Sequence, residues 1–308
     1  MMPPAAGQPS AISPPHQLLP PPTLEEKHLV CECAEDSVLG KLEALVPAGE
    51  PYLCRDPHAP AFVLVPGLGM DGLGFVRQLP LGAHARLHFF QTPNQPVMEE
   101  QGLNRFARYV EAYIQARKLD QHPGGVVLGG CSMGGAISLS VAIRARVKLR
   151  GLVLIGTFGS SRHLPRWQRA AAPLAWVLPM GLMRKLAWQM VARTRFFGAV
   201  SPHEADWLVS CKIKRSQRYF GHAIAALTRM EHIPDAARLR VPTLVLHGTH
   251  DHVLPHAAGQ ELASTIPNAR FKTIENSGHA LFFSDHDAVN RSIAEFLMEL
   301  RAAPPPSA

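Results

Sequence analysis

Short runs of apolar residues alternate along the chain with longer segments in which apolar residues recur every three or four positions. The short runs are typical of buried strands and lie at 61–65, 86–90, 125–129, 152–155, 243–247 and 271–274. The longer segments are typical of amphipathic helices and lie at 103–118, 133–145, 255–266 and 287–300. Continuous apolar strands separated by helices predict an α/β fold with a mostly parallel, doubly wound sheet that is covered on both faces.

This alternation stops between residues 159 and 240, where helical patterns are interrupted by prolines. We interpret this segment as an inserted helical cap that lies over the carboxyl ends of the strands. Eight of the first 22 residues are prolines, which neither pair into a sheet nor close a helix. The predicted division is a disordered tail at 1–27, a core at 28–158 and 241–300, the cap at 159–240 and a second disordered tail at 301–308. Two further antiparallel strands are expected at 28–33 and 51–54.

Positive charge is concentrated in the predicted cap. The chain carries a formal net charge of +7, and residues 159–240 hold 14 Lys and Arg against four Asp and Glu, together with all four tryptophans. Such a segment attracts nucleic acid, an anionic membrane surface or an anionic ligand. The basic residues are dispersed and lack a helix-turn-helix or RNA-binding signature, so we expect no nucleic-acid partner.

Composition and cysteine usage narrow the class of protein. Apolar residues make up 46% of the chain, as in ordinary globular proteins, and none of the apolar runs reaches 18 residues. The first basic residue is Lys27, which does not match a secretory signal. The five cysteines are irregularly spaced and do not suggest a disulfide framework. We therefore expect a cytoplasmic protein.

A serine lies in a glycine-rich turn between a predicted strand and a predicted helix. Ser132 stands in the sequence Gly-Cys-Ser-Met-Gly-Gly at 130–135. Glycines two positions before and after the serine allow a sharp turn that lifts its hydroxyl out of the chain, and the following helix N-terminus favours developing negative charge. Cys131 is expected to be buried packing, with its side chain directed away from the tip of the turn.

A serine hydroxyl needs a base to become a nucleophile, and the base needs a carboxylate to orient it. Asp251 follows the predicted strand at 243–247, and His279 follows the one at 271–274. In a parallel sheet, the loops after the strands meet at one edge, where Ser132 also lies. Asp251 as a helix N-cap and His279 as an ordinary loop histidine are the alternative interpretations.

With these residues, the chain resembles the α/β-hydrolase superfamily over roughly residues 28–300. The resemblance rests on the serine turn, on the order Ser–Asp–His along the chain and on the helical cap. It implies that Ser132 is the nucleophile, His279 the base and Asp251 the acid that fixes the imidazole tautomer. It also implies an oxyanion hole made of the backbone N–H groups of Met133 and Leu68. Pro66-Gly67 stands where many members have His-Gly.

Two competing motifs indicate other chemistries. The spacing Gly67-x-Gly69-x-x-Gly72 follows a strand, as in a dinucleotide-binding loop, but the acidic residue expected about 20 positions later is not clearly present. Several histidines between 247 and 256 suggest a metal site, but no second ligand cluster accompanies them. We expect neither a cofactor nor a metal.

The predicted function is hydrolysis of carboxylic ester or thioester bonds in a small-molecule substrate with a hydrophobic acyl group. Trp167, Trp176 and Met183 in the cap are candidates for the acyl pocket, against the alternative of ordinary packing of cap on core. The basic cap residues are candidates for contact with an anionic leaving group or, peripherally, an anionic membrane surface. The same three catalytic residues also support acyl transfer or carbon–carbon cleavage, and a non-catalytic binding protein is the alternative from another class.

Overall fold

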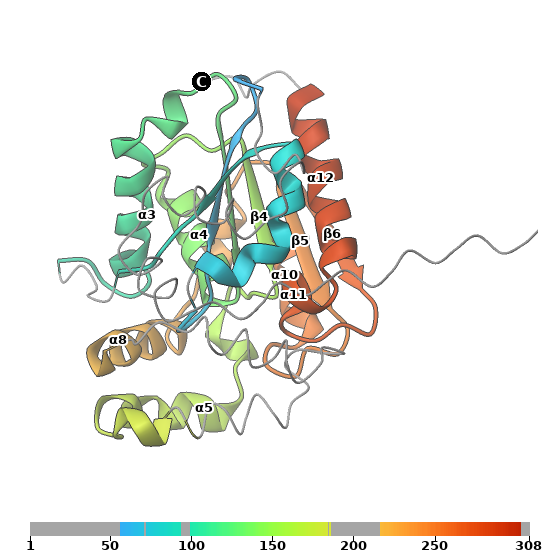
Figure 1. The fold of residues 1–308 in the computed structure, drawn as a ribbon. Coiled ribbons are helices and arrows are strands. Elements are labelled where there is room, and N and C mark those ends of the chain that lie inside the picture. The colour runs from blue at the N-terminus through green and yellow to red at the C-terminus, as the bar shows by residue number, and fades with distance from the viewer. Residues whose placement is uncertain (1–55, 71, 94–98, 184, 186–215, 303–308) are drawn as a thin grey trace, which may run out of the picture.

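Six parallel strands form one sheet in the computed structural model, which describes residues 56–70, 72–93, 99–183, 185 and 216–302. The strands are β1 (Ala61–Val65), β2 (Arg86–Phe89), β3 (Val126–Cys131), β4 (Gly151–Ile155), β5 (Thr243–Gly248) and β6 (Ala269–Ile274). Their order across the sheet is β2-β1-β3-β4-β5-β6, and every neighbouring pair is parallel (Figure 1). The predicted parallel sheet is therefore confirmed.

The burial of each strand follows its position in the sheet. All residues of the four inner strands β1, β3, β4 and β5 are buried, because helices cover both faces. The outermost strands β2 and β6 alternate between buried or half-buried and more exposed positions. This is the reason why continuous apolar runs identify the inner strands in the sequence.

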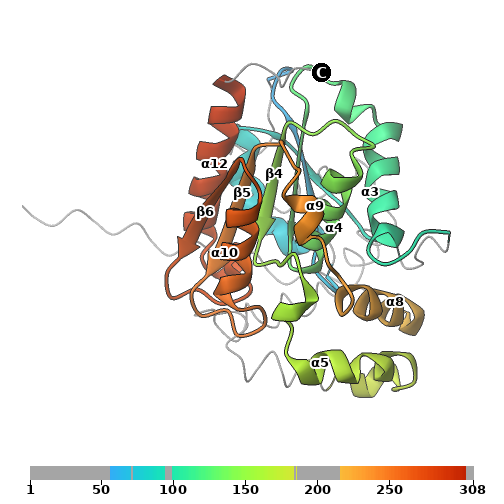
Figure 2. The same ribbon diagram turned by 180° about the vertical axis from the view of Figure 1, so that it is seen from behind.

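Helices cover both faces of the sheet. One face is covered by η1 (Gly72–Ala83), α11 (Leu281–Ser284) and α12 (His286–Ala302), and the other by α3 (Asn104–Ala116), α4 (Met133–Arg144) and α10 (His256–Thr265). The short helix η2 (Leu119–Gln121) follows α3. Figures 1 and 2, which view the molecule from opposite sides, show α12 and α4 on opposite sides of the strands.

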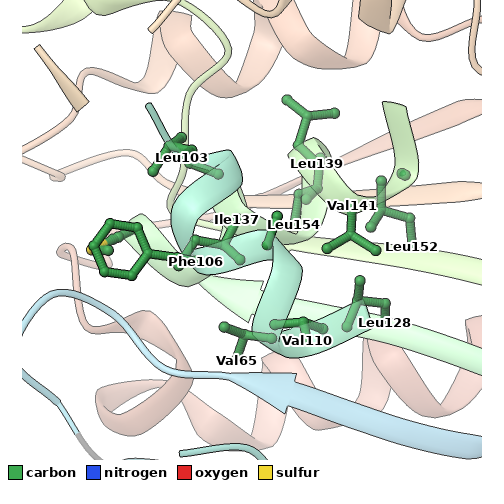
Figure 3. Packing of buried hydrophobic residues seen from close by; sticks show 14 of the residues in the cluster. Val65, Leu103, Phe106, Val110, Leu128, Ile137, Leu139, Val141, Leu152 and Leu154 are labelled. Atoms are coloured by element: carbon green, nitrogen blue, oxygen red, sulfur yellow. The ribbon is translucent and has the colours of Figure 1, made fainter. Parts of the chain in front are cut away.

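Successive residues of one strand serve two separate cores. Phe62 and Leu64 of β1 pack under η1 and α12, whereas Val63 and Val65 pack under α3 and α4. Figure 3 shows the second core, where Phe106 and Val110 of α3 lie against Ile137 of α4. Because the two cores share the strands, each strand is held from both faces at once.

The sequence-based boundaries differ from the structure at a few points. The helix predicted to end at 300 continues through Ala302, so Arg301 and Ala302 do not belong to the predicted tail. The 3-10 helix η1 was not predicted, because Gly72, Gly74 and Pro80 are typical of a loop. The predicted tail at 1–27 and the strands at 28–33 and 51–54 lie outside the described residues, as do 303–308.

The described parts of the segment expected to be the cap are helical. They comprise η3 (Ser161–His163), α5 (Arg166–Ala171), η4 (Ala172–Trp176), α8 (Gln217–Leu227) and α9 (Ile233–Ala236). Ser160 and Glu231 pair in an isolated bridge, and the Ser160 hydroxyl donates to the Glu231 carboxylate at 2.6 Å. Figure 1 shows α5 and α8 beyond the ends of the strands. The division into cap and core stays a prediction.

Among the helices that the structure describes, none is both long and apolar enough to cross a bilayer.

Truncation of a residue in the core between the sheet and helices α3 and α4 tests the packing of that core. Leu128 of β3 is fully buried, so Leu128→Ala should lower the free energy of unfolding by about 2–5 kcal/mol, through lost burial and the cavity left behind. Urea unfolding followed by circular dichroism measures this change. Met298→Ala on α12, where the side chain is 48% exposed, is the control and should change stability by less than about 1 kcal/mol. Equal effects of the two substitutions would contradict the packing described here.

Candidate active site

Ser132 occupies a strained backbone position between β3 and α4. Its φ of 51° and ψ of −121° place a residue other than glycine in a region that costs about 1–3 kcal/mol. Its N–H donates to the Ile155 carbonyl at 2.9 Å, and its carbonyl accepts from the Thr157 hydroxyl at 2.7 Å. Contacts to the end of β4 therefore hold the turn in this conformation, and the Ser132 side chain remains partly exposed.

Two glycines allow the turn to approach its neighbours. A Cβ on Gly130 would lie 2.4 Å from the backbone of Gly134, inside the turn itself. A Cβ on Gly134 would lie 2.0 Å from the carbonyl oxygen of Val65 and 2.6 Å from that of Pro66. The first glycine allows the sharp turn, and the second brings the start of α4 against the loop after β1.

That loop is folded into a tight turn beside the serine. The Met70 N–H donates to the Gly67 carbonyl at 3.1 Å, and Gly69 has a φ of 72°, as the third position of a type II turn requires. Leu68 is the second residue of this turn and is partly buried. Met133, in the first turn of α4, has a backbone N–H with no acceptor within its helix. The two predicted donors thus lie on segments that contact each other through Gly134.

Cys131 is fixed beneath this loop. Its side chain is 2% exposed, its thiol is free, and a hydrogen bond from the Gly67 backbone reaches it. Burial raises the pKa of the thiol to about 12, although this hydrogen bond acts in the opposite direction. The prediction that Cys131 is buried packing is confirmed, and its thiol is un-ionised at neutral pH.

Asp251 and His279 meet at the carboxyl ends of β5 and β6. The Oδ2 atom of Asp251 lies 2.7 Å from Nδ1 of His279. Asp251 is 7% exposed and His279 is 5% exposed. An ionised carboxylate only accepts hydrogen bonds, so Nδ1 of His279 carries the proton, and Nε2 is the ring nitrogen that accepts a proton from another group.

Backbone hydrogen bonds hold together the two loops that carry this pair. The His250 N–H donates to the Ser277 carbonyl at 2.9 Å, and the Asn276 N–H donates to the Thr249 hydroxyl at 2.8 Å. The Ser277 hydroxyl donates to the carboxylate of Asp285 at 2.5 Å, which anchors the His279 loop to the end of α11. The Asp251–His279 distance is therefore set by both loops and not by the two side chains alone.

The environment of Asp251 keeps its carboxyl ionised. Burial by itself would raise its pKa, but the charges and hydrogen bonds of His279 and His247 outweigh burial and hold the pKa well below its usual range. The backbone N–H groups of Val253 and Leu254 donate to its Oδ1 atom at 2.9 and 2.8 Å. Both carboxylate oxygens are thus occupied by donors, which favours the charged form.

His247 is a second imidazole at the same carboxylate and was not predicted as a site residue. It lies on β5 and is fully buried, with its Nε2 atom 3.0 Å from the Leu254 carbonyl and 3.3 Å from Oδ2 of Asp251. A carbonyl only accepts, so Nε2 carries the proton and donates to both oxygens. The sequence signals were its place four residues before Asp251 in a buried strand and its membership of the histidine-rich segment at 247–256.

Two aromatic residues of α8 approach the serine turn. Tyr219 is buried, its hydroxyl lies 4.0 Å from the sulfur of Met133, and its ring meets Phe106 edge-on. The Phe220 ring lies so near the loop after β1 that a Cβ on Gly69 would be 3.2 Å from it. Sequence reasoning missed both residues, because nothing in the sequence shows that α8 returns to this loop.

The three candidate substrate-binding residues lie in other parts of the cap. Trp167 on α5 is 63% exposed, and Met183, in a helical stretch that begins at residue 180, is partly buried. Trp176 is 42% exposed, packs against Gly221 of α8 and meets the His222 ring at 4.7 Å between ring centroids. Their contact with a substrate stays a prediction. Trp188 and Trp207, and most of the basic residues expected to form the positive face, lie outside the described residues.

The glycine-rich loop and the histidine-rich segment lack the surroundings that a dinucleotide-binding loop or a metal site needs in the described residues. The glycine-rich loop at 67–72 leads into the 3-10 helix η1 and not into an α-helix, as a dinucleotide-binding loop would require. His247 bonds to Leu254 and Asp251, whereas His256 bonds to the Thr273 hydroxyl at 3.0 Å. Across the ranges described above, no three His, Cys, Asp or Glu side chains are grouped so as to hold a metal ion.

Comparisons with known proteins agree with this fold. Residues 62–292 match the model of the alpha/beta hydrolase family. Over 267 residues, or 82% of the chain, the sequence is 33% identical to Polyketide synthase ThaQ of Burkholderia thailandensis, of which it spans only 12%. It is also 30% identical to the pimeloyl-acyl-carrier-protein methyl ester esterase of Aromatoleum aromaticum, over 57% of this chain and 74% of that protein. MenH from S. aureus has the same fold, with a TM-score of 0.68 at 18% identity, covering 81% of this chain and 97% of that one.

The depressed pKa of Asp251 predicts a pH-dependent contribution to stability. A lowered folded-state pKa stabilises the protein above the unfolded value of about 3.9, and this contribution is lost as the pH falls further towards the folded-state pKa. Asp251→Asn should therefore cost more stability at pH 5 than at pH 3. Urea unfolding midpoints of both proteins at each pH measure the difference.

Glu295→Gln, at an exposed position of α12, is the matched loss of one negative charge. The stability difference between this variant and the wild type should change little over the same pH interval. If the cost of Asp251→Asn were also constant between pH 5 and pH 3, the proposed electrostatic role of the Asp251 environment would be wrong.

Proposed function

Because the chain belongs to the alpha/beta hydrolase family, we propose that it is a serine hydrolase that cleaves carboxylic ester or thioester bonds. In this proposal Ser132 is the nucleophile, His279 the general base and acid, and Asp251 the carboxylate that orients His279. Met133 and Leu68 supply the backbone N–H groups of the oxyanion hole. The substrate is a small molecule with a hydrophobic acyl group.

One observation supports this proposal more strongly than any other. The 2.7 Å contact between Nδ1 of His279 and Oδ2 of Asp251 joins two buried residues that lie 28 positions apart in the chain. It occurs at the same edge of the sheet as the strained Ser132. A carboxylate–imidazole pair at the same sheet edge as a partly exposed serine supports activation of the hydroxyl for attack on a carbonyl.

The first half of the reaction forms an acyl-enzyme. The Ser132 hydroxyl attacks the carbonyl carbon while its proton passes to Nε2 of His279, and Asp251 stabilises the resulting imidazolium. The carbonyl oxygen becomes an oxyanion, which accepts hydrogen bonds from the Met133 and Leu68 N–H groups. As the tetrahedral intermediate collapses, the bond to the leaving oxygen or sulfur breaks, and His279 returns the proton to that atom.

Water completes the cycle. His279 accepts a proton from a water molecule, which attacks the acyl carbon and forms a second oxyanion in the same site. The bond between Oγ of Ser132 and the acyl carbon then breaks, and the proton on His279 returns to the serine. The products are the carboxylic acid and an alcohol or thiol, and the enzyme is regenerated.

The surroundings of the serine support an apolar acyl group. Phe220 lies against the loop that carries Leu68, and the buried Tyr219 reaches the Met133 side chain, so aromatic residues of α8 pack on both segments that carry the proposed oxyanion donors. Trp167, Trp176 and Met183 extend the proposed apolar lining within the cap. The relative from Aromatoleum aromaticum is named for an ester of an acyl group attached to a carrier protein, which is consistent with an acyl substrate.

Acyl transfer and carbon–carbon cleavage use the same three residues, and product analysis separates them from hydrolysis. Incubation of an acyl ester with and without an added alcohol gives only free acid for a hydrolase. A new ester that consumes the alcohol would assign acyl transfer instead. A binding protein with this fold would give neither product.

Covalent labelling and a serine variant test the nucleophile. A fluorophosphonate probe should label Ser132, and mass spectrometry of the labelled peptide identifies the site. Ser132→Ala should abolish labelling and reduce kcat by several orders of magnitude, up to about 10⁶-fold, because the attacking hydroxyl is lost. Cys131→Ala is the adjacent control and should retain labelling. Full activity of Ser132→Ala would disprove the mechanism.

Replacement of Leu68 by proline tests the oxyanion hole through a single backbone hydrogen. The second residue of a type II turn accommodates proline, so Leu68→Pro removes the N–H while preserving the turn. We expect kcat to fall by about 10²–10³-fold with a smaller change in KM. Leu68→Ala retains the N–H and controls for loss of the side chain. If both variants had the same kcat, the Leu68 N–H would not stabilise the oxyanion.

A further inference from the structure

A cleft of about 640 Å³ opens between the start of the predicted cap and the loop that carries Asp251. One wall is formed by η3 and α5, with Arg162, His163, Arg166 and Arg169, and the other by the segment from Asp251 to Pro255. Its volume lies within the range of about 300–1,000 Å³ that is typical of small-molecule sites. The proposed mechanism assigns no role to this cleft.

The cationic wall of the cleft is only partly neutralised. Arg162 and His163 both contact the carboxylate of Glu261 on α10. Neither the Arg166 nor the Arg169 side chain has an ion-pair partner in the part of the chain that the structure describes, and the Nε atom of Arg169 is buried without a hydrogen-bond acceptor. The Arg166 and Arg169 guanidinium groups therefore carry positive charge that no described carboxylate neutralises.

The acidic group of the cleft does not neutralise these arginines. Asp251 already accepts hydrogen bonds from two backbone N–H groups and contacts His279 and His247. The sequence has no Asp or Glu between Gly159 and His203, so the segment that forms this wall has no acidic neighbours along the chain. The cleft therefore keeps a net positive charge beside the proposed catalytic pair.

We propose that this cleft binds a phosphate-bearing leaving group of the substrate, an inference that rests on the serine hydrolase function proposed above. Guanidinium groups match the oxygens of a phosphate with paired hydrogen bonds, and Arg166 and Arg169 provide two of them. A volume of about 640 Å³ has room for more than one phosphate, so the cleft can also hold part of the larger group that carries it.

The position of the cleft assigns it to the leaving group and not to the acyl chain. Ser132 follows β3, which lies between β1 and β4 in the sheet. The half-buried Phe220 lies near the loop after β1, and the buried Tyr219 packs behind Met133 after β3, whereas the cleft lies over the loops after β4 and β5. A substrate with its carbonyl at Ser132 would then extend its acyl chain to the first side and its anionic group to the second.

Two thioesters with the same acyl chain test this assignment. Octanoyl-coenzyme A carries phosphates on its leaving group, and octanoyl-N-acetylcysteamine carries none. We expect the wild-type 308-residue chain to show a kcat/KM at least about tenfold higher for the coenzyme A thioester. Arg166→Gln combined with Arg169→Gln should reduce kcat/KM for that thioester by about 10- to 100-fold, because two charge-assisted hydrogen bonds are lost. The value for the phosphate-free thioester should change less than about twofold.

A matched double variant controls for the loss of two positive charges. Lys148→Gln combined with Arg291→Gln removes two exposed charges outside both the predicted cap and the cleft lining. It should retain the wild-type preference for the coenzyme A thioester. Thermal unfolding of all variants verifies that they remain folded.

The source of the phosphate is resolved by a third substrate. Octanoyl-4′-phosphopantetheine carries only the phosphate that coenzyme A shares with a carrier-protein thioester. If it matches octanoyl-coenzyme A, the pantetheine phosphate is the recognised group, and if it is slower, the nucleotide contributes. Either result supports the cleft, provided that the preference depends on Arg166 and Arg169.

Failure of this inference is distinct from failure of the proposed function. Equal kcat/KM values of the wild type for the first two thioesters would contradict the cleft assignment, as would an equal loss on both in the Arg166/Arg169 variant. Absence of hydrolysis of every thioester, together with absence of fluorophosphonate labelling, would contradict the serine hydrolase function and the inference that rests on it.

Discussion

The close approach of the Ser132 turn to the loop after β1 is the constraint on which the site depends. Gly134 lies against the carbonyl oxygens of Val65 and Pro66, with no room for a side chain between them. This contact places the start of α4, and with it the Met133 N–H, beside the turn that contains Leu68. The contact also follows from the fold, because β1 and β3 are neighbours and their carboxyl ends lie at the same level of the sheet. A sheet with another strand order would separate the two proposed donors.

Electrostatic organisation is concentrated at Asp251. A buried carboxylate is stable only when donors surround it, and here two backbone N–H groups and two imidazoles do so. His247 uses its one N–H for both Leu254 and Asp251, so it reinforces the loop and the carboxylate together. The orientation of His279 is therefore a property of the whole β5 loop. Such prior organisation reduces the rearrangement that proton transfer requires.

Much of this fold was readable from the sequence, since every described strand is an apolar run or lies within one residue or two of it. The serine turn and the order of Asp251 and His279 were also readable, because loops after parallel strands meet at one edge. His247 was not, because a histidine in a buried strand has the same sequence pattern whether it packs or bonds to a carboxylate. Tyr219 and Phe220 were missed because their place beside Met133 and Gly69 depends on the path of the chain through the cap.

The structure shows where part of the positive charge of residues 159–240 lies. The composition alone does not show where the positive charge of this segment lies on the molecule. Steering of ligands, solvation and membrane contact therefore explain it equally well. In the fold, its first arginines lie on the wall of a cleft that is also lined by Asp251, while the aromatic residues of α8 lie against Met133 and the loop after β1. The two ends of the proposed site would therefore differ in polarity along the direction of the strand order. Under the proposed function, a substrate that is apolar at one end and anionic at the other would fit in only one orientation, and the predicted cap would contribute to specificity before any bond is broken.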